Sequence, residues 1–310
     1  SLHVMGILSN ATPLLEQLSI DEAFLDVTDL PQPAETIARE LQLKINSQVK
    51  LPCSLGVAAN KLVAKIANNI GKAANKTGEA PNAIMVIPPG DEAAFLTPLP
   101  VQELWGVGPK TAARFEKLGI RTIGDLAKMP PERLVMQFGK MGGDLWQHAR
   151  GIDERPVTPH HEAKSISQEL TFEKDVTDFT RLDRTLRQLS EQIGYRLRQE
   201  HLCAFTVRIK LRWHDFSTLT RQITLPQPAD QDGILYAAAR QLFEHTWQPR
   251  RPVRLLGVGV SGLVAAYHQL SLWETPSDKE ARLLEALDAL RERYGRQVVR
   301  RGISPIRNKR

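Results

Sequence analysis

The sequence has few cysteines and no long apolar segment. Its only cysteines among 310 residues are Cys53 and Cys203, which lie far apart and lack the close spacing of metal ligands. This excludes a disulfide-stabilised scaffold, gives no support for zinc, and indicates free thiols in a reducing cytosol. Nothing approaches the roughly 20 apolar residues that cross a bilayer, and no secretory signal is present. We therefore expect a cytoplasmic protein that does not associate with membranes.

The composition is otherwise that of an ordinary folded protein, 42% hydrophobic and 25% charged. A chain of this length is expected to form two or three domains. The net charge of +6 is unevenly distributed, because residues 1–95 are net acidic and every later segment is net basic. An acidic segment followed by basic ones suits a metal site joined to modules that bind a polyanion.

Two adjacent carboxylates, Asp21 and Glu22, precede a strand-like segment at residues 23–28. Their charges repel, so both stay ionised only where a cation or a basic partner offsets them. Hard divalent cations such as Mg²⁺ take carboxylate oxygens as ligands, and a pair of such ions can assist phosphoryl transfer. The alternative for an isolated Asp-Glu pair is a solvated turn.

A short apolar strand ending at residues 56–58 is predicted to lead into a helix with Leu62 and Ile66 on one face. Lys61, Lys65 and Lys72 place positive charge on this helix, which suits a triphosphate held against bound metal. A basic helix that faces solvent is the alternative.

Together, residues 18–28 (LSIDEAFLDVT) and 54–67 (SLGVAANKLVAKIA) resemble the palm domain of Y-family translesion DNA polymerases, in particular the DNA polymerase IV group. The resemblance implies a DNA-directed DNA polymerase, a nucleotidyltransferase that uses primer-template DNA and deoxynucleoside triphosphates. It makes Asp21 and Glu22 catalytic, metal-binding carboxylates and Lys72 the contact to nucleotide phosphates. It also implies Mg²⁺, with two ions in the complete site.

The chain departs from that family at its beginning. The family's N-terminal strand, with the first metal-binding aspartate, and the fingers domain have no counterpart here, and no Asp-x-Asp followed by paired aromatics occurs. We expect an N-terminally truncated polymerase, for which the activity of this chain alone stays open.

A glycine-rich turn at residues 106–108 precedes a helix with Pro109 near its first position. The free amides of such a helix start can bind phosphate, and glycines allow close approach. The segment resembles a helix-hairpin-helix motif, with Ala112, Ala113, Phe115 and Leu118 at packing positions, although many glycine-rich turns are only turns. The predicted DNA contacts here are Gly106, Val107, Gly108, Lys110 and Thr111.

The order strand, helix, two strands, helix, strand is predicted after residue 164. An amphipathic helix carries Leu182, Leu186, Leu189, Ile193 and Leu197, and residues 205–213 alternate, with Phe205, Val207, Ile209, Leu211 and Trp213 on one face. This part resembles the family's little-finger domain, in which Arg208, Lys210 and Arg212 would face DNA phosphates. An ordinary solvated sheet face is the equal alternative.

The C-terminal part resembles a clamp-docking peptide followed by a helix. Gln269, Leu270, Leu272 and Trp273 would bind a sliding clamp, with apolar anchors in a groove of the partner. The helix is expected to start at a capping box at residues 277–280, to align Leu283, Leu287, Leu290 and Tyr294, and to stop at Gly295.

The predicted fold class is α+β and multidomain, and the protein is expected to be monomeric. A non-catalytic protein that binds primer-template or damaged DNA through thumb, little finger and clamp peptide is the alternative function. A structure-specific nuclease is a weaker one, since a second acidic cluster of the right kind is missing. The expected parts are a partial palm (1–95), a helical thumb (96–155), a linker (156–164), a little finger (165–263) and a clamp-binding helical tail (264–310).

Overall fold

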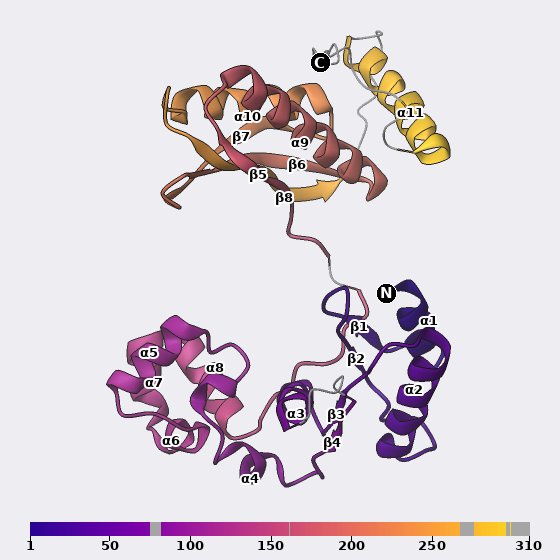
Figure 1. The fold of residues 1–310 in the computed structure, drawn as a ribbon, viewed down its shortest axis with the longest axis vertical. Helices are drawn as coiled ribbons and strands as arrows, with labels where there is room; N and C mark the ends of the chain where they lie inside the picture. Colours follow the sequence, from indigo (N-terminus) through magenta and orange to yellow (C-terminus); the bar gives the residue numbers. More distant parts are fainter. Residues whose placement is uncertain (75–81, 161, 267–275, 296–297, 299–310) are drawn as a thin grey trace. The chain divides into compact units, whose positions relative to one another are not determined.

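The computed structural model describes residues 1–74, 82–160, 162–266, 276–295 and 298. The chain forms two compact units, Ser1–His161 and Glu162–Arg310, each with its own helices and strands (Figure 1). The border between them falls within residues 156–164. Both units mix α and β structure, which confirms the predicted α+β class.

The first part of unit 1 holds two small sheets flanked by helices. Strands β1 and β2 form an antiparallel hairpin, and β3 and β4 pair in parallel with helix α3 between them in the chain. Helix α1 packs on α2, which buries Leu8, Ile37, Leu41 and Ile45 in an apolar cluster. The elements are α1 (Leu2–Ser9), β1 (Leu15–Gln17), β2 (Ala23–Leu25), α2 (Ala34–Val49), β3 (Leu55–Val57), α3 (Lys61–Ala74) and β4 (Ile84–Val86).

The second part of unit 1 is helical and shares a hydrophobic core with α3. Leu62 and Ile66 of α3, which were predicted to share a face, are fully buried in the same cluster as Phe115 and Leu126. Helix α3 is therefore packed between the strands and the helical part. The helices are α4 (Glu92–Leu96), a 3₁₀ turn (Val101–Glu103), α5 (Pro109–Lys117), α6 (Ile123–Lys128), α7 (Pro131–Phe138) and α8 (Lys140–Ala149).

Unit 2 is a four-stranded antiparallel sheet, in the order β5-β8-β6-β7, with α9 and α10 on one face (Figure 1). The predicted order of strands and helices is confirmed, and the predicted apolar stripe of α9 is buried against the sheet. The elements are β5 (Ser165–Val176), α9 (Phe179–Gln199), β6 (Leu202–Trp213), β7 (Thr218–Ala229), α10 (Asp232–Thr246), β8 (Val253–Ala265) and α11 (Pro276–Tyr294).

The predicted alternation of β6 is correct from Val207 onward and wrong at Phe205. The register of β6 with β7 shifts between Ala204 and Thr206, where the extra residues lie on β7, whereas its register with β8 is continuous there. Gly262 of β8, which lies opposite Phe205, has a φ of 65°, so the partner strand departs from extended geometry at this point. Ala204 is fully buried, whereas Phe205 is only half-buried.

Helix α11 ends at Gly295 as predicted, but its predicted apolar stripe is not the buried face. Leu283, Leu290 and Tyr294 are exposed, whereas Leu284 and Asp288 are buried. The reason is an ion pair, because Arg198 Nε of α9 donates to Asp288 Oδ2 at 2.6 Å and thereby turns this side of α11 toward the domain. Arg198 also donates to Asp232 Oδ1, 3.0 Å away.

None of the helices in the described part of the chain is long and apolar enough to cross a membrane. In the described part of the chain neither Cys53 nor Cys203 is in a disulfide. Burial raises the pKa of the Cys53 thiol.

Candidate active site and nucleic-acid interface

The predicted catalytic carboxylates lie in the tight turn between β1 and β2. The turn closes where the Leu18 amide donates to the Glu22 carbonyl at 2.9 Å. Ser19 Oγ donates to Asp21 Oδ1 at 2.6 Å, and this hydrogen bond is the main reason that the pKa of Asp21 is lowered. The positive charges of Lys72 and Lys65 contribute in the same direction. The exposed Asp21 carboxyl is therefore an anion at neutral pH.

Two lysines one turn apart on α3 reach carboxylates of the β1–β2 hairpin. Lys65 Nζ lies 2.5 Å from Glu22 Oε1, and Lys61 Nζ lies 2.7 Å from Glu16 Oε2. Only 15% and 10% of these two lysine side chains are exposed. The alternative of a basic helix that faces solvent is wrong for Lys61 and Lys65. The structure thus brings Asp21 and Glu22 together with the lysines of α3.

The start of α3 is held by side chains that the sequence analysis did not single out. Asn60 Oδ1 accepts the Val63 amide at 3.0 Å and caps the helix, while Asn60 Nδ2 donates to the Gly151 carbonyl at 2.8 Å. Asp153 Oδ2 accepts the Leu62 amide at 3.2 Å. These bonds fix the direction of α3, and hence of its lysines, relative to the helical part of unit 1.

Asp153 is itself paired with Arg155, whose Nε lies 2.6 Å from Asp153 Oδ1. Burial acts to raise the pKa of Asp153, but the hydrogen bonds from Arg155 outweigh it and lower that pKa. The guanidinium of Arg155 also lies over the ring of Trp105, 4.8 Å from its centroid. Asp153 and Leu62 are 91 residues apart in the chain, so no local sequence pattern indicates this cap.

The donor set at the β1–β2 turn fits a hard divalent cation. Within the described residues no group of three or more His, Cys, Asp or Glu side chains could hold a metal ion. Mg²⁺ does not need such a cage, since it keeps several waters and is often bound by one or two carboxylates together with substrate phosphates. The pair Asp21 and Glu22 meets that requirement.

The predicted glycine-rich phosphate site forms the start of α5. Gly106 has a φ of 99°, which favours glycine, and Gly108 is the N-cap residue of the helix. No side chain caps this helix start, whose first amides have no partner within the helix. Val107 is buried, whereas Gly106, Gly108 and Lys110 are exposed and Thr111 is half-buried. The turn therefore offers backbone amides and one lysine to an external ligand.

The predicted packing positions of this motif are correct for two residues of four. Ala112 and Phe115 are buried in the core of unit 1, but Ala113 and Leu118 are exposed. Positions 112 and 115 are three apart on α5 and face the core, which leaves position 113 on the outer side. Leu118 is the C-cap residue and lies beyond the helix.

The predicted basic row of β6 lies on the sheet face opposite the helices. Val207, Ile209 and Leu211 are buried under α9 and α10, so Arg208, Lys210 and Arg212 project from the open face. Lys210 Nζ is paired with Glu169 Oε2 at 2.9 Å, and Arg212 Nε donates to Thr218 Oγ1 at 2.9 Å. Glu169 was not predicted as part of this surface.

The predicted clamp-binding residues, from Gln269 to Trp273, lie outside the described residues. Their role stays a prediction.

Three family models match successive parts of the chain. The impB/mucB/samB family model matches residues 1–69, and the model of that family's C-terminal domain matches residues 163–272. Between them, the thumb domain of DNA polymerase-iota matches residues 102–153.

Solved structures with the same fold include a Y-family DNA polymerase chimera of Dbh and Dpo4. Its TM-score is 0.72 at 24% identity, over 86% of this chain and 75% of that chain. An insertion ternary complex of Dbh DNA polymerase gives a TM-score of 0.55 at 23% identity, over 86% of this chain and 75% of that one. At these identities the likeness shows the fold.

Curated relatives are more similar in sequence and span nearly the whole chain. DNA polymerase IV of Desulfatibacillum aliphaticivorans is 38% identical over 306 residues, which cover 96% of this chain and 75% of the relative. DNA polymerase IV of Moorella thermoacetica is 39% identical over 98% of this chain and 75% of the relative. With the palm-like carboxylate and lysine site and the helix-hairpin-helix thumb in place, these matches show that the chain belongs to the Y-family of translesion DNA polymerases, in the DNA polymerase IV group.

Proposed function

We propose that the protein carries out template-directed nucleotidyl transfer on primer-template DNA, with Asp21 and Glu22 as its metal-binding carboxylates. The observation that supports this assignment best is the meeting of the β1–β2 turn with α3, where Lys65 pairs with Glu22 and the charge of Lys72 acts on Asp21. An acidic turn facing a row of lysines suits a metal-bound triphosphate, because each charge has an opposite partner.

Each residue of this site has its own task in the proposal. Asp21 and Glu22 would hold Mg²⁺, two ions in the complete site, and bound Mg²⁺ would supply charge neutralisation at the reacting phosphate. Lys65 orients the Glu22 carboxylate by the short contact between them. Lys72, in the last turn of α3, would bind the phosphates of the incoming deoxynucleoside triphosphate.

Two surfaces would grip the DNA without reading its bases. One is the start of α5, with Gly106, Gly108 and Lys110, and the other is the open sheet face with Arg208, Lys210 and Arg212. Backbone amides and cationic side chains against phosphates give affinity that falls steeply with salt. We also propose that the protein acts in the cytoplasm and as a monomer.

Primer extension with Mg²⁺ and all four nucleotides tests the active-site assignment. We expect Asp21→Asn and Glu22→Gln each to lower the extension rate about 10²- to 10³-fold, the usual cost of losing one preorganised electrostatic group. Asp29→Asn is the matched control, since Asp29 is an exposed aspartate a few residues beyond β2. We expect it to change the rate little.

Two outcomes would contradict the proposal. Extension at the control rate by both carboxylate variants would mean that other residues bind the metal. No extension by the unchanged protein, with salt-sensitive DNA binding intact, would favour the non-catalytic DNA-binding alternative.

The proposed partner of the segment from Gln269 to Trp273 is a sliding clamp. Truncation of apolar anchors at an interface often costs about 2 kcal/mol or more. We therefore expect the double variant Leu272→Ala and Trp273→Ala to lose at least about 30-fold in clamp affinity in a titration. Unchanged affinity would refute this partner.

A further inference from the structure

The open face of the unit 2 sheet carries two adjacent rows of the same design. In one row Ser167 of β5, Gly259 of β8 and Arg208 of β6 lie side by side across three strands. In the next row the corresponding residues are Glu169, Gly257 and Lys210. Each row has a glycine on the middle strand, so the two rows share a trough between a β5 side chain and a β6 cation.

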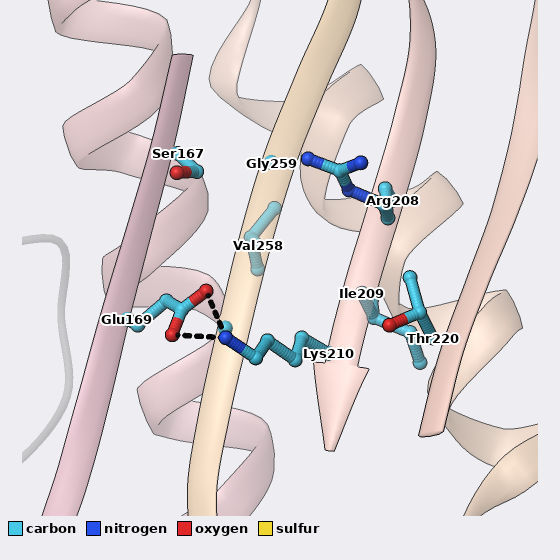
Figure 2. A pocket seen from close by; sticks show the side chains of 9 residues that line it. Ser167, Glu169, Arg208, Ile209, Lys210, Thr220, Val258 and Gly259 are labelled. Carbon is cyan, nitrogen blue, oxygen red and sulfur yellow. Dashed lines mark hydrogen bonds and ion pairs between the residues drawn. The ribbon is translucent and has the colours of Figure 1, made fainter. Parts of the chain in front are cut away.

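The trough is a real depression in the face. It is a shallow groove of about 260 Å³, open to solvent and lined by the residues of both rows (Figure 2). A Cβ at position 257 would lie 2.8 Å from Glu169 Cγ, and one at 259 would lie 3.2 Å from Ser167 Cβ. Only glycine keeps the floor at backbone level, which lets a ligand approach the strand closely.

The two rows differ in what fills the trough. In the Glu169 row, Gly257 pairs with Glu169 on one side and Lys210 on the other. Lys210 points toward Glu169, and its Nζ lies 3.0 and 2.9 Å from the two carboxylate oxygens (Figure 2). In the Ser167 row, Arg208 extends toward Gly259 and has no ion-pair partner among the described residues (Figure 2). Both Lys210 and Glu169 keep about a third of their side chains exposed, so solvent and ligands can reach the pair.

We propose that Glu169 is an internal competitor of DNA phosphate for Lys210, so that this row is a closed phosphate site beside the open one at Arg208. The inference rests on the proposed DNA binding by this face. Two carboxylate oxygens hold the ammonium where phosphate oxygens would otherwise lie. To contact DNA, the Lys210 ammonium must either leave the Glu169 carboxylate or bind the carboxylate and a phosphate at the same time. In both cases the carboxylate repels the nearby phosphate. Glu169 therefore lowers the affinity for DNA and the number of phosphates neutralised.

The test measures affinity for primer-template DNA as a function of salt in the full chain. We expect Glu169→Gln to bind about two- to fivefold more tightly at low salt, the range that the loss of one exposed ion pair spans. The log–log salt slope should steepen by up to about 0.9, the value of one additional phosphate contact. Glu169→Ser, which copies the Ser167 row, should have the same effect and guards against a folding defect of a single variant.

The matched control is Glu244→Gln. Glu244 is an exposed glutamate on α10 and is paired with Arg240. Its replacement removes the same charge as Glu169→Gln, but from the side of unit 2 that carries the helices. Tightening by Glu169→Gln and Glu169→Ser beyond this control supports the competitor role. If the Glu169 variants bind no more tightly than the control, the effect is one of net charge and the competitor role is overturned. Weaker binding by both Glu169 variants also overturns it, because Glu169 would then stabilise the sheet by its cross-strand ion pair with Lys210.

Arg208→Ala and Lys210→Ala distinguish the inference from the proposed function. If both leave affinity unchanged, this face does not bind DNA, and the proposal for the interface falls together with the inference. If Arg208→Ala weakens binding while the Glu169 variants equal the control, the interface stands and only the competitor role is overturned.

Discussion

The two units use lysine–glutamate pairs in opposite ways. In unit 1 the Lys61–Glu16 pair is largely buried, with 10% and 5% of the side chains exposed, and Glu16 also accepts the Thr158 amide at 2.8 Å. In unit 2 the Lys210–Glu169 pair is about one-third exposed and spans an open groove. A buried pair cannot exchange partners without leaving a desolvated charge, whereas an exposed pair can.

The contrast distinguishes a buried ion pair that holds two elements of the fold together from an exposed ion pair that can change partners. The buried pair joins α3 to the β1–β2 hairpin and thereby fixes where the next pair, Lys65–Glu22, can form. The latter has intermediate exposure, which suits a carboxylate that is held in place yet open to a cation. We therefore expect mutations of the buried Lys61–Glu16 pair to change stability and mutations of the exposed Lys210–Glu169 pair to change DNA binding.

The largest effect is expected for Lys61→Met. Removal of the lysine takes a countercharge from the buried Glu16, and breaking such a pair typically costs about 3–5 kcal/mol. The free energy of unfolding, measured by urea denaturation at pH 7, should fall by about 3 kcal/mol.

Two lysine variants serve as controls for that measurement. Lys210→Met, which breaks the exposed pair, should cost no more than about 1 kcal/mol. Lys44→Met changes an exposed lysine on α2 for which no ion pair is found among the described residues, and it should be near neutral. Equal losses for Lys61→Met and Lys210→Met would show that burial does not separate the two pairs.

A smaller effect, on binding alone, is expected for Gly259→Ala. The added methyl group would lie 3.2 Å from Ser167 Cβ and 3.6 Å from Arg208 Nη2, so it fills the floor of the open row and presses on the arginine. We expect about fivefold weaker DNA binding, equivalent to about 1 kcal/mol, with little change in melting temperature.

Ser261→Ala on the same strand is the control, because it changes a half-buried open-face side chain without filling the trough. A fivefold loss for Ser261→Ala as well would mean that any change on β8 weakens binding. The glycine floor would then have no special role.

Much of unit 2 could be predicted from the sequence because its elements are long and regular. The five apolar positions of α9 repeat through about four turns, and tertiary packing can hardly override so consistent a period. The prediction for Phe205 failed because the strands on either side of it are irregular, at Gly262 of β8 and in the register with β7, which no alternation pattern within β6 reveals. The predicted stripe on α11 failed because Arg198 draws Asp288, which lies outside that stripe, into the interior.

In the candidate site, the sequence predicted the kinds of charge but not their partners. Asp21, Glu22 and the α3 lysines were found because they are clustered in the chain. Glu16 and Asp153 were missed because each is a single acidic residue, and its burial depends on contacts with segments far away in sequence. Glu169 could have been suspected from the two glycines at 257 and 259, since a glycine pair two apart on a strand leaves a trough on one face.

The smallest effect concerns the tip of the β6–β7 hairpin, where an exposed carboxylate has a low pKa without burial. Asp215 Oδ1 accepts both the hydroxyl of Ser217, at 2.6 Å, and its amide, at 3.0 Å. Arg251 Nη2 lies 3.0 Å from Asp215 Oδ2. Together these contacts lower the pKa of Asp215 to about 2, with the Ser217 hydrogen bonds as the larger cause and Arg251 as the smaller one.

Because this pKa is lower in the folded protein than in the unfolded chain, the stabilisation by Asp215 is complete above pH of about 4. It is lost as the pH falls toward about 2. We expect the carboxyl ¹³C resonance of Asp215 to titrate with a midpoint of about 2. Ser217→Ala should raise that midpoint more than Arg251→Ala does. A midpoint near the ordinary value of 3.8, or a larger rise with Arg251→Ala, would show that the ion pair and not the local hydrogen bonds sets the charge of this exposed residue. A larger rise with Arg251→Ala would also mean that Asp215, like the carboxylates of unit 1 that are paired with lysines, depends mainly on its ion pair.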